Sequence, residues 1–253
     1  MAVGTIYYLY ANLYSATATT LTASATDATY NVANTKNPER TLTWQVTSAV
    51  TETILIDLGS SLAATVCAMA DYAIRSGGTL KLYEGGNGGS PGAYNLVATF
   101  VAQDSITRVG YQTFGSTAAR HWKLEWTASG SGTASVGYVF LGTYQSDTAP
   151  ERPTIDQNDP SVPVTSLDNQ ESYAVKQNFA SSSFRFPIMT ETQLGYVQTV
   201  FSAVGISTPF FLILDTNTTW MAWLLRFSSQ ISKTVVPTTT RAYAVSYSWK
   251  EAL

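Results

Sequence analysis

The chain has 253 residues, of which 45% are hydrophobic and only 12% are charged, with a net charge of −3. The hydrophobic share is ample for a packed core, whereas 14 scattered Lys and Arg cannot form the basic stripe of a nucleic-acid-binding protein. A single cysteine, Cys67, excludes an intramolecular disulfide, and its apolar neighbours predict that it is buried. Since charge is scarce, Ser, Thr, Gly, Asn and Tyr must cover the surface, which favours burial in an assembly.

The N-terminal residues contain no basic segment followed by an apolar stretch, and no window approaches the roughly 20 apolar residues of a membrane span. We therefore expect synthesis in the cytoplasm and no membrane insertion. Tyr7 and Tyr8 lie on the first expected strand and must point to its opposite faces, so one of them is exposed or meets a partner.

Short segments rich in Thr, Val, Tyr and Ile, separated by Gly, Ser, Asn or Pro, predict a β-sandwich or barrel. Strands are expected at 6–10, 42–47, 52–57, 65–70, 79–83, 96–101, 110–114, 121–127 and 134–141. In the eighth, Trp122, Leu124 and Trp126 alternate with charged residues, which indicates a half-buried strand. Gly85–Gly92 lacks the Lys-Ser/Thr of a phosphate loop and is expected to be a mobile hairpin tip.

Residues 146–170 contain four prolines and no periodicity, which predicts a linker. Beyond it, strands are expected at 171–178, 182–188, 210–214, 220–227 and 241–250, with Trp220, Trp223, Leu224 and Leu225 in the core. Residues 190–204 predict the one helix, which Thr190 caps and Gly205 ends; Leu194, Val197, Val200, Phe201 and Val204 share a face. The expected domains are thus 1–145, 146–170 and 171–253.

Several strings in the first part resemble the galactose-binding-like jelly roll of discoidin domains and carbohydrate-binding modules. They are Ile54–Gly59, Phe114-Gly115 and the strand Arg120-His121-Trp122-Lys123-Leu124. The resemblance implies an all-β fold, with an N-terminal jelly-roll sandwich followed by a smaller β-domain that carries the helix. It also implies a host-surface glycan as a candidate partner, and a structural calcium ion at the loop Asn34–Glu39.

The run Val136–Gly142, the proline-rich connection and the aromatic end Ser246–Leu253 together resemble the layout of tailed-phage virion proteins. This implies a virion structural protein of the tail tip or baseplate, located in the virion, that assembles with other tail subunits and with copies of itself. Two alternatives stay open: a carbohydrate-binding module without enzyme activity, and a capsid decoration protein.

Residues suited to catalysis are few. His121 is the only histidine and no Gly-x-Ser-x-Gly turn accompanies it, so a Ser-His-Asp triad is not indicated. One His and one Cys cannot form a usual zinc site. Glycosidase chemistry needs only two carboxylates, but none sits in a motif that indicates a raised pKa; the candidates are Asp57, Asp71, Glu84, Glu125 and Asp215. Asp156–Asp159 lacks the Gly and Glu of an EF-hand loop. The sequence therefore predicts no enzyme, with no catalytic, cofactor-binding or metal-binding residue.

Overall fold

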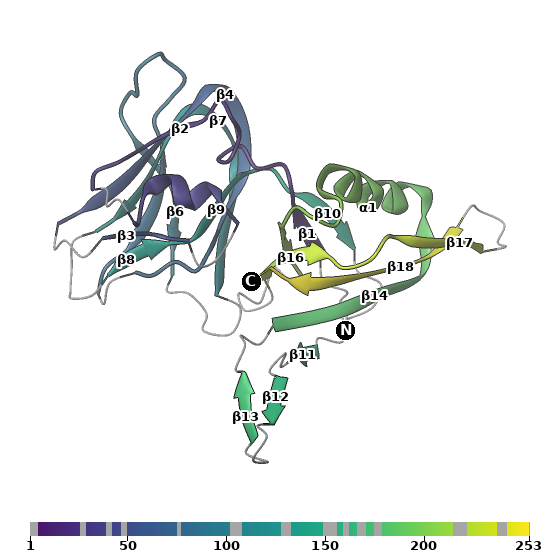
Figure 1. Cartoon of the computed structure of the whole chain (residues 1–253). Coiled ribbons are helices and arrows are strands. Elements are labelled where there is room, and N and C mark those ends of the chain that lie inside the picture. The colour runs from purple at the N-terminus through teal and green to yellow at the C-terminus, as the bar shows by residue number, and fades with distance from the viewer. Residues whose placement is uncertain are drawn as a thin grey trace. The chain divides into compact units, whose positions relative to one another are not determined.

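A computed structural model shows a chain built almost entirely of antiparallel strands (Figure 1). It describes residues 5–25, 29–38, 42–46, 50–74, 77–101, 108–127, 133–148, 156–158, 162–165, 171–174, 179–214, 222–236 and 242–252. The chain divides into two compact units. The larger unit comprises Gly4–Thr148 and Phe210–Leu224, and the smaller unit comprises Met1–Val3, Ala149–Pro209 and Leu225–Leu253.

The larger unit contains a β-sandwich. Its elements are β1 (Thr5–Leu9), β2 (Thr20–Ala23), the 3-10 helix η1 (Val32–Lys36), β3 (Trp44–Val46), β4 (Glu52–Ala70), β5 (Leu80–Glu84), β6 (Asn95–Phe100), β7 (Val109–Trp126), β8 (Ala134–Val136), β9 (Tyr138–Gly142), β10 (Gln145–Thr148) and β15 (Phe210–Ile213). One sheet has the strand order β2-β4-β7-β5-β6, and β9 pairs with β4; β3 pairs with β8 in a second sheet. Aromatic and aliphatic side chains fill the space between the sheets. The ring centres of Trp44 on β3 and Trp126 on β7 lie 5.0 Å apart.

The two longest strands, β4 and β7, pair with each other from Glu52 opposite Trp126 to Ala70 opposite Val109. The sequence predicted two short strands in place of each, because small residues at 59–61 and 115–117 look like turns. In the structure each strand continues through these residues, with register shifts between Asp57 and Leu62 and between Ala64 and Val66. Such irregularities bend a strand without ending it. The same pair of strands therefore continues through the sandwich on both sides of the bend.

Outside the sandwich, β1 lies between β10 and β15. Tyr8 is fully buried, while Tyr7 is half-exposed and its ring stacks on Tyr144 at 4.0 Å. The expected opposite orientation of these two tyrosines is thus confirmed, and a residue of the same chain contacts the outer one.

The smaller unit pairs a β-sheet with a helix. Its elements are β11 (Asp156–Asn158), β12 (Val162–Thr165), β13 (Glu171–Ala174), β14 (Phe179–Thr190), α1 (Glu191–Val204), β16 (Ala222–Phe227, from Leu225 onward), β17 (Ser232–Val236) and β18 (Ala242–Glu251). Within it, β18 pairs with β14, β16 and β17, β11 pairs with β14, and β12 and β13 form a separate hairpin. Figure 1 shows α1 lying over one face of this sheet.

The predicted helix is confirmed at both ends. Thr190 accepts a hydrogen bond from the backbone N–H of Gln193 at 3.3 Å, and the Gln193 side chain accepts one from the Thr190 backbone at 3.0 Å. This reciprocal capping box satisfies two N–H groups that the first turn leaves without helical partners. Gly205, at a φ of 57°, ends the helix. Leu194, Val197, Val200 and Val204 are buried.

The predicted fold class is confirmed: an all-β jelly-roll sandwich followed by a smaller β unit with one helix among the described residues. The sequence missed β2 and β17, and it read 134–141 as one strand where Gly137 separates β8 from β9. Three short strands, β10, β11 and β12, lie within 145–165. Trp223 and Leu224 are buried, as expected, but in the larger unit; Trp220 lies outside the described residues. The domain boundaries 1–145, 146–170 and 171–253 stay a prediction.

Asn12 holds the segment after β1 against β9. Its side-chain amide donates to the Val139 carbonyl at 2.8 Å and to the Tyr138 hydroxyl at 3.1 Å, and its oxygen accepts from the backbone N–H of Tyr14 at 3.0 Å and of Leu141 at 3.1 Å. These four bonds use the full capacity of the amide, so a side chain without an amide cannot form all of them.

We predict that Asn12→Ala lowers the free energy of unfolding by about 2 kcal/mol or more, because it leaves buried backbone groups without partners. Chemical denaturation followed by tryptophan fluorescence measures the change. Asn31→Ala, at the exposed start of η1, is the matched control and should cost less than half as much. Equal losses would show that Asn12 has no special role.

Candidate functional site

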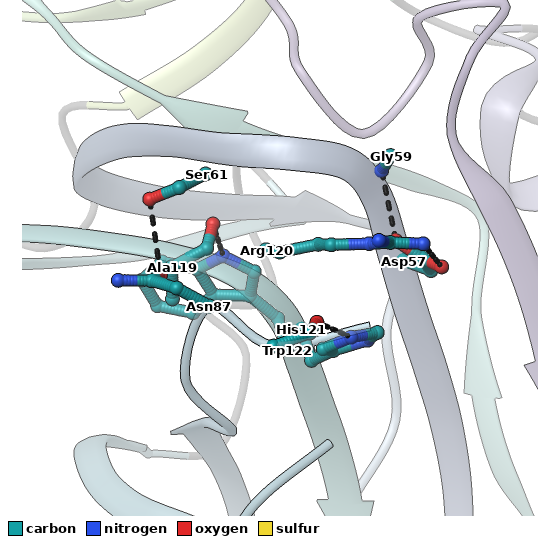
Figure 2. A network of polar contacts seen from close by, with 9 residues as sticks. Asp57, Gly59, Ser61, Asn87, Ala119, Arg120, His121 and Trp122 are labelled. Atoms are coloured by element: carbon teal, nitrogen blue, oxygen red, sulfur yellow. Dashed lines mark hydrogen bonds and ion pairs between the residues drawn. The ribbon is translucent and has the colours of Figure 1, made fainter. Parts of the chain in front are cut away.

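An ion pair ties β4 to β7 where the two strands bend. The Arg120 Nε donates to Asp57 Oδ1 at 2.7 Å, and its Nη2 donates to Oδ2 at 2.8 Å (Figure 2). Such a two-pronged geometry is stronger and more directional than a single contact. About a third of each side chain stays exposed, 29% for Arg120 and 33% for Asp57. The pair is therefore rigid and still open to solvent.

Asp57 also shapes the bend itself. Its Oδ1 accepts a hydrogen bond from the backbone N–H of Gly59 at 2.8 Å, and Gly59 has a φ of +77°. Side chains with a Cβ are strained in that conformation, so glycine is required there. The hydrogen bonds from Arg120, with the smaller contributions of the Gly59 N–H and nearby positive charge, lower the pKa of Asp57 to about 2. The carboxylate is thus ionised at any physiological pH.

The glycine-rich loop 85–92 is anchored beside this pair. Its base is closed by a hydrogen bond from Gly92 N to Gly85 O at 2.7 Å, and Gly85 N donates to the carbonyl of His121 at 2.7 Å. The buried imidazole of His121 contacts the Gly88 carbonyl through Nε2 at 2.8 Å. Since a carbonyl only accepts, Nε2 carries the proton. The loop is therefore held at its base and at Gly88; that its tip is mobile stays a prediction.

Loop 85–92 brings Asn87 to the bend of β4. Both Asn87 and Ser61 are exposed, and the Ser61 hydroxyl donates to Asn87 Oδ1 at 3.0 Å (Figure 2). Among the described residues nothing accepts from the amide N–H groups of Asn87, so they can donate to a ligand. We call Asp57, Ser61, Asn87, Arg120 and His121 the bend cluster.

A second group of side chains follows the bend cluster along the outer face of the sheet. Leu55, Lys123, Tyr83 and Leu96 lie opposite one another on β4, β7, β5 and β6, in one row across four strands. The Lys123 ammonium lies 4.3 Å from the centre of the Tyr83 ring and 4.8 Å from that of Tyr94. It also forms a 2.7 Å ion pair with Glu125. An aromatic and apolar strip thus adjoins the polar bend.

Neither carboxylate of this surface suits a general acid. Burial alone would raise the pKa of Glu125, but hydrogen bonds from Lys123 and Tyr83 outweigh it, so the pKa is lowered. The pKa of Asp57 is also lowered. A glycosidase needs one carboxyl with a raised pKa to protonate the leaving group, which is the opposite of what these two residues offer. Burial raises the pKa of the Cys67 thiol and keeps it unreactive.

The other candidates from the sequence have structural partners. Glu84 accepts from Gly86 N at 2.9 Å and from the Asn95 side chain at 2.5 Å, and Asp71 lies 3.8 Å from Arg108. Asp156 lies on β11, paired with β14. Asp215, Glu39 and Asp159 lie outside the described residues. Sequence reasoning missed Arg120, Ser61 and Asn87 as site residues, because only the register of β4 against β7 brings residues 63 positions apart together.

In the part of the chain that the structure describes, no group of three or more His, Cys, Asp or Glu could hold a metal ion. Near the loop suggested for calcium, the Lys36 ammonium donates to the carbonyls of Thr19 at 2.6 Å and Ala16 at 3.4 Å. Asn34 donates its amide to the carbonyls of Thr29 and Thr43. Two carbonyls that could face a cation thus already face an ammonium group. No helix among the described residues is long and apolar enough to cross a membrane.

The sequence matches no protein-family model and no curated protein. Solved structures are similar to about half of the chain. One is chitosan-binding module 1 of a chitosanase/glucanase from Paenibacillus sp. IK-5, with 21% identity, 51% of this chain and 97% of that chain covered, and a TM-score of 0.44. Another is a family 32 carbohydrate-binding module of Clostridium perfringens, solved with galactose, with 14% identity, 55% and 99% covered, and a TM-score of 0.43. At these values the similarity assigns neither a family nor a function.

We predict that the stabilising contribution of the Asp57–Arg120 pair is lost in acid. The folded pKa of Asp57 lies at about 2, below the value of about 3.9 in an unfolded chain. The contribution is therefore complete above about pH 4 and disappears as the pH falls through 2. The free energy of unfolding of Asp57→Asn, measured with urea, should be below wild type at pH 7 and should approach it at pH 2.

Arg120→Gln serves as the companion variant, because it removes the partner and keeps the carboxylate. Its difference from wild type should narrow over the same pH interval. A difference for Asp57→Asn that stays constant between pH 7 and pH 2 would contradict the lowered pKa of Asp57.

Proposed function

We propose that the protein is a non-catalytic carbohydrate-binding protein and that the bend cluster of the larger unit is its binding site. The observation that carries the proposal is the ion pair of Asp57 and Arg120, fixed in a two-pronged geometry yet about a third exposed. The backbone of Arg120 donates to Gly86 of loop 85–92, which carries the exposed amide of Asn87.

The chemistry of the bend cluster fits the hydroxyl groups of a sugar. Each hydroxyl can donate one hydrogen bond and accept two, so a sugar needs donors and acceptors side by side. The Asn87 amide and the Arg120 Nη1 supply donors, while Asp57 and Ser61 supply acceptors. Neighbouring hydroxyls on a pyranose ring can therefore bridge the carboxylate and the guanidinium without breaking the ion pair.

The cluster is also arranged before any ligand arrives. Asp57 is fixed by Arg120 and Gly59, and loop 85–92 is fixed by its own closure and by His121. Groups that are already in position lose little conformational entropy on binding. The adjoining Tyr83 and Tyr94 offer ring surface beside the polar groups, the combination on which a sugar ring can lie.

The proposed function is to bind a sugar without cleaving it. It rests on the lowered pKa values of Asp57 and Glu125, since ionised carboxylates accept hydrogen bonds but supply no proton to a glycosidic oxygen. A screen with chromogenic glycosides tests it, and release of the chromophore by the wild type but not by Asp57→Asn would contradict it.

We predict that Asn87→Ala and Ser61→Ala each weaken glycan binding about fivefold, because each removes a neutral hydrogen bond worth about 1 kcal/mol. A glycan array identifies a ligand, and calorimetry on the full chain measures the affinities. Both side chains are exposed and contact only each other in the described structure, so the fold should be unaffected.

Val101→Ala is the control, since Val101 is an exposed side chain of the same unit that follows β6. It lies at the end of β6 where Phe100 pairs with Leu80, away from loop 85–92. Its affinity should equal that of the wild type. The proposal fails if the array shows no glycan bound, or if Val101→Ala weakens binding as much as Asn87→Ala does.

The role in a tailed-phage virion, at the tail tip or baseplate or as a capsid decoration protein, stays a prediction. One observation favours assembly: the smaller unit exposes large apolar side chains, with Val235 of β17 69% exposed and Ile188 of β14 60% exposed. Light scattering on the purified chain tests the expected homo-oligomer, and a monomer at high concentration would contradict it. Electron microscopy of particles would locate the chain directly.

A further inference from the structure

The open face of the smaller unit's sheet differs chemically from the face under α1. On β14 and β18 one set of side chains is aromatic and buried, comprising Phe184, Phe186, Tyr247 and Trp249. The alternate set carries hydroxyls and cations, comprising Ser181, Ser183, Arg185, Ser246, Ser248 and Lys250. Ser183, Arg185, Ser246 and Lys250 are exposed. We call this second set, with Arg226 of β16, the serine face.

Two cations on the serine face lie directly opposite each other. The register of β16 against β18 pairs Arg226 with Lys250. Side chains at opposite positions of an antiparallel pair have Cβ atoms about 5 Å apart, and like charges there are destabilising. Within the described residues, no ion pair or hydrogen bond of either side chain compensates for this charge. Glu251, next to Lys250, alternates to the other face of the sheet and accepts a hydrogen bond from Ala180 N at 3.0 Å. On the serine face itself, the nearest acidic position in the described register is Asp156 opposite Ser181, two strands from Lys250, or about 10 Å.

At one atom of Arg226, a hydrogen-bond acceptor is also missing among the described residues. Its Nε is buried and has no hydrogen-bond partner in the described part of the chain, although the side chain as a whole is only half-buried. A buried donor without an acceptor is costly, and the cost is greater for a charged group. A negatively charged hydrogen-bond acceptor would offset the repulsion between Arg226 and Lys250. It would also give the buried Nε of Arg226 a partner.

We propose that the serine face binds an acidic polysaccharide, with one of its carboxylate or sulfate groups seated between Arg226 and Lys250. The hydroxyls of Ser183 and Ser248, 2.8 Å apart, lie beside this pair and suit the sugar hydroxyls. The serine face carries no aromatic ring among its described residues, and stacking platforms are what binders of single-stranded nucleic acid use. The site is separate from the bend cluster and does not depend on the function proposed for it.

Affinity electrophoresis of the full chain at low salt, in gels that contain dextran sulfate or neutral dextran, tests the proposal. Dextran sulfate should retard the wild type and neutral dextran should not. Lys250→Gln and Arg226→Gln should each weaken the retardation about tenfold, because each removes a charge-assisted contact. Lys233→Gln is the matched control: it removes one exposed positive charge from β17, opposite Val245 and therefore off the serine face, and should change nothing.

Thermal unfolding separates binding from structure. Because Lys250→Gln relieves repulsion with Arg226, its melting temperature should equal or exceed that of the wild type. Equal effects of Lys233→Gln and Lys250→Gln on retardation, a lowered melting temperature of Lys250→Gln, or no retardation of the wild type would each overturn the proposal. Tighter binding of oligodeoxythymidylate than of dextran sulfate would overturn the assignment to a polysaccharide. Asn87→Ala should keep full retardation, so this site and the bend cluster can fail independently.

Discussion

The pairing of β4 with β7 is the constraint on which the larger unit depends. Its ladder extends from Glu52 to Ala70, and the register fixes which side chains enter the core and which meet solvent. A shift of β4 by one residue against β7 would turn Ile54 outward and Leu55 inward. The same register places Asp57 opposite His121 and within reach of Arg120. Core packing and the polar bend are therefore two consequences of one alignment.

The two units expose different chemistry. The larger one presents a fixed ion pair with an amide and a hydroxyl, in which each charge is matched, beside an aromatic strip that holds Lys123. The smaller one presents hydroxyls with cations that have no counter-charge among the described residues. An ion pair whose two charges compensate each other can bind neutral hydroxyl groups. Cations without a nearby negative charge can bind an anion. With only 12% charged residues in the chain, each of these charges contributes a large part of the local surface chemistry.

Local sequence patterns predicted most of the fold. Alternation predicted the strand that holds Trp122, Leu124 and Trp126, and cap residues located both ends of α1. The continuous β4 and β7 were not predictable in this way, because Gly59 reads as a turn until its partner strand is known. The ion pair of Asp57 and Arg120 was missed for the same reason. The apolar alternation of 54–58 fits that of 122–126 in several registers two residues apart, so it does not by itself bring Asp57 to Arg120.

Backbone amide shifts recorded during titration with a glycan found on an array test the central claim most directly. Binding at the bend cluster predicts that the largest changes fall on Gly59, Ser61, Asn87, Gly88 and Arg120, with the smaller unit unchanged. Changes centred on other loops of the sandwich, or spread evenly over both units, would contradict the claim that the bend of β4 and β7 forms the site.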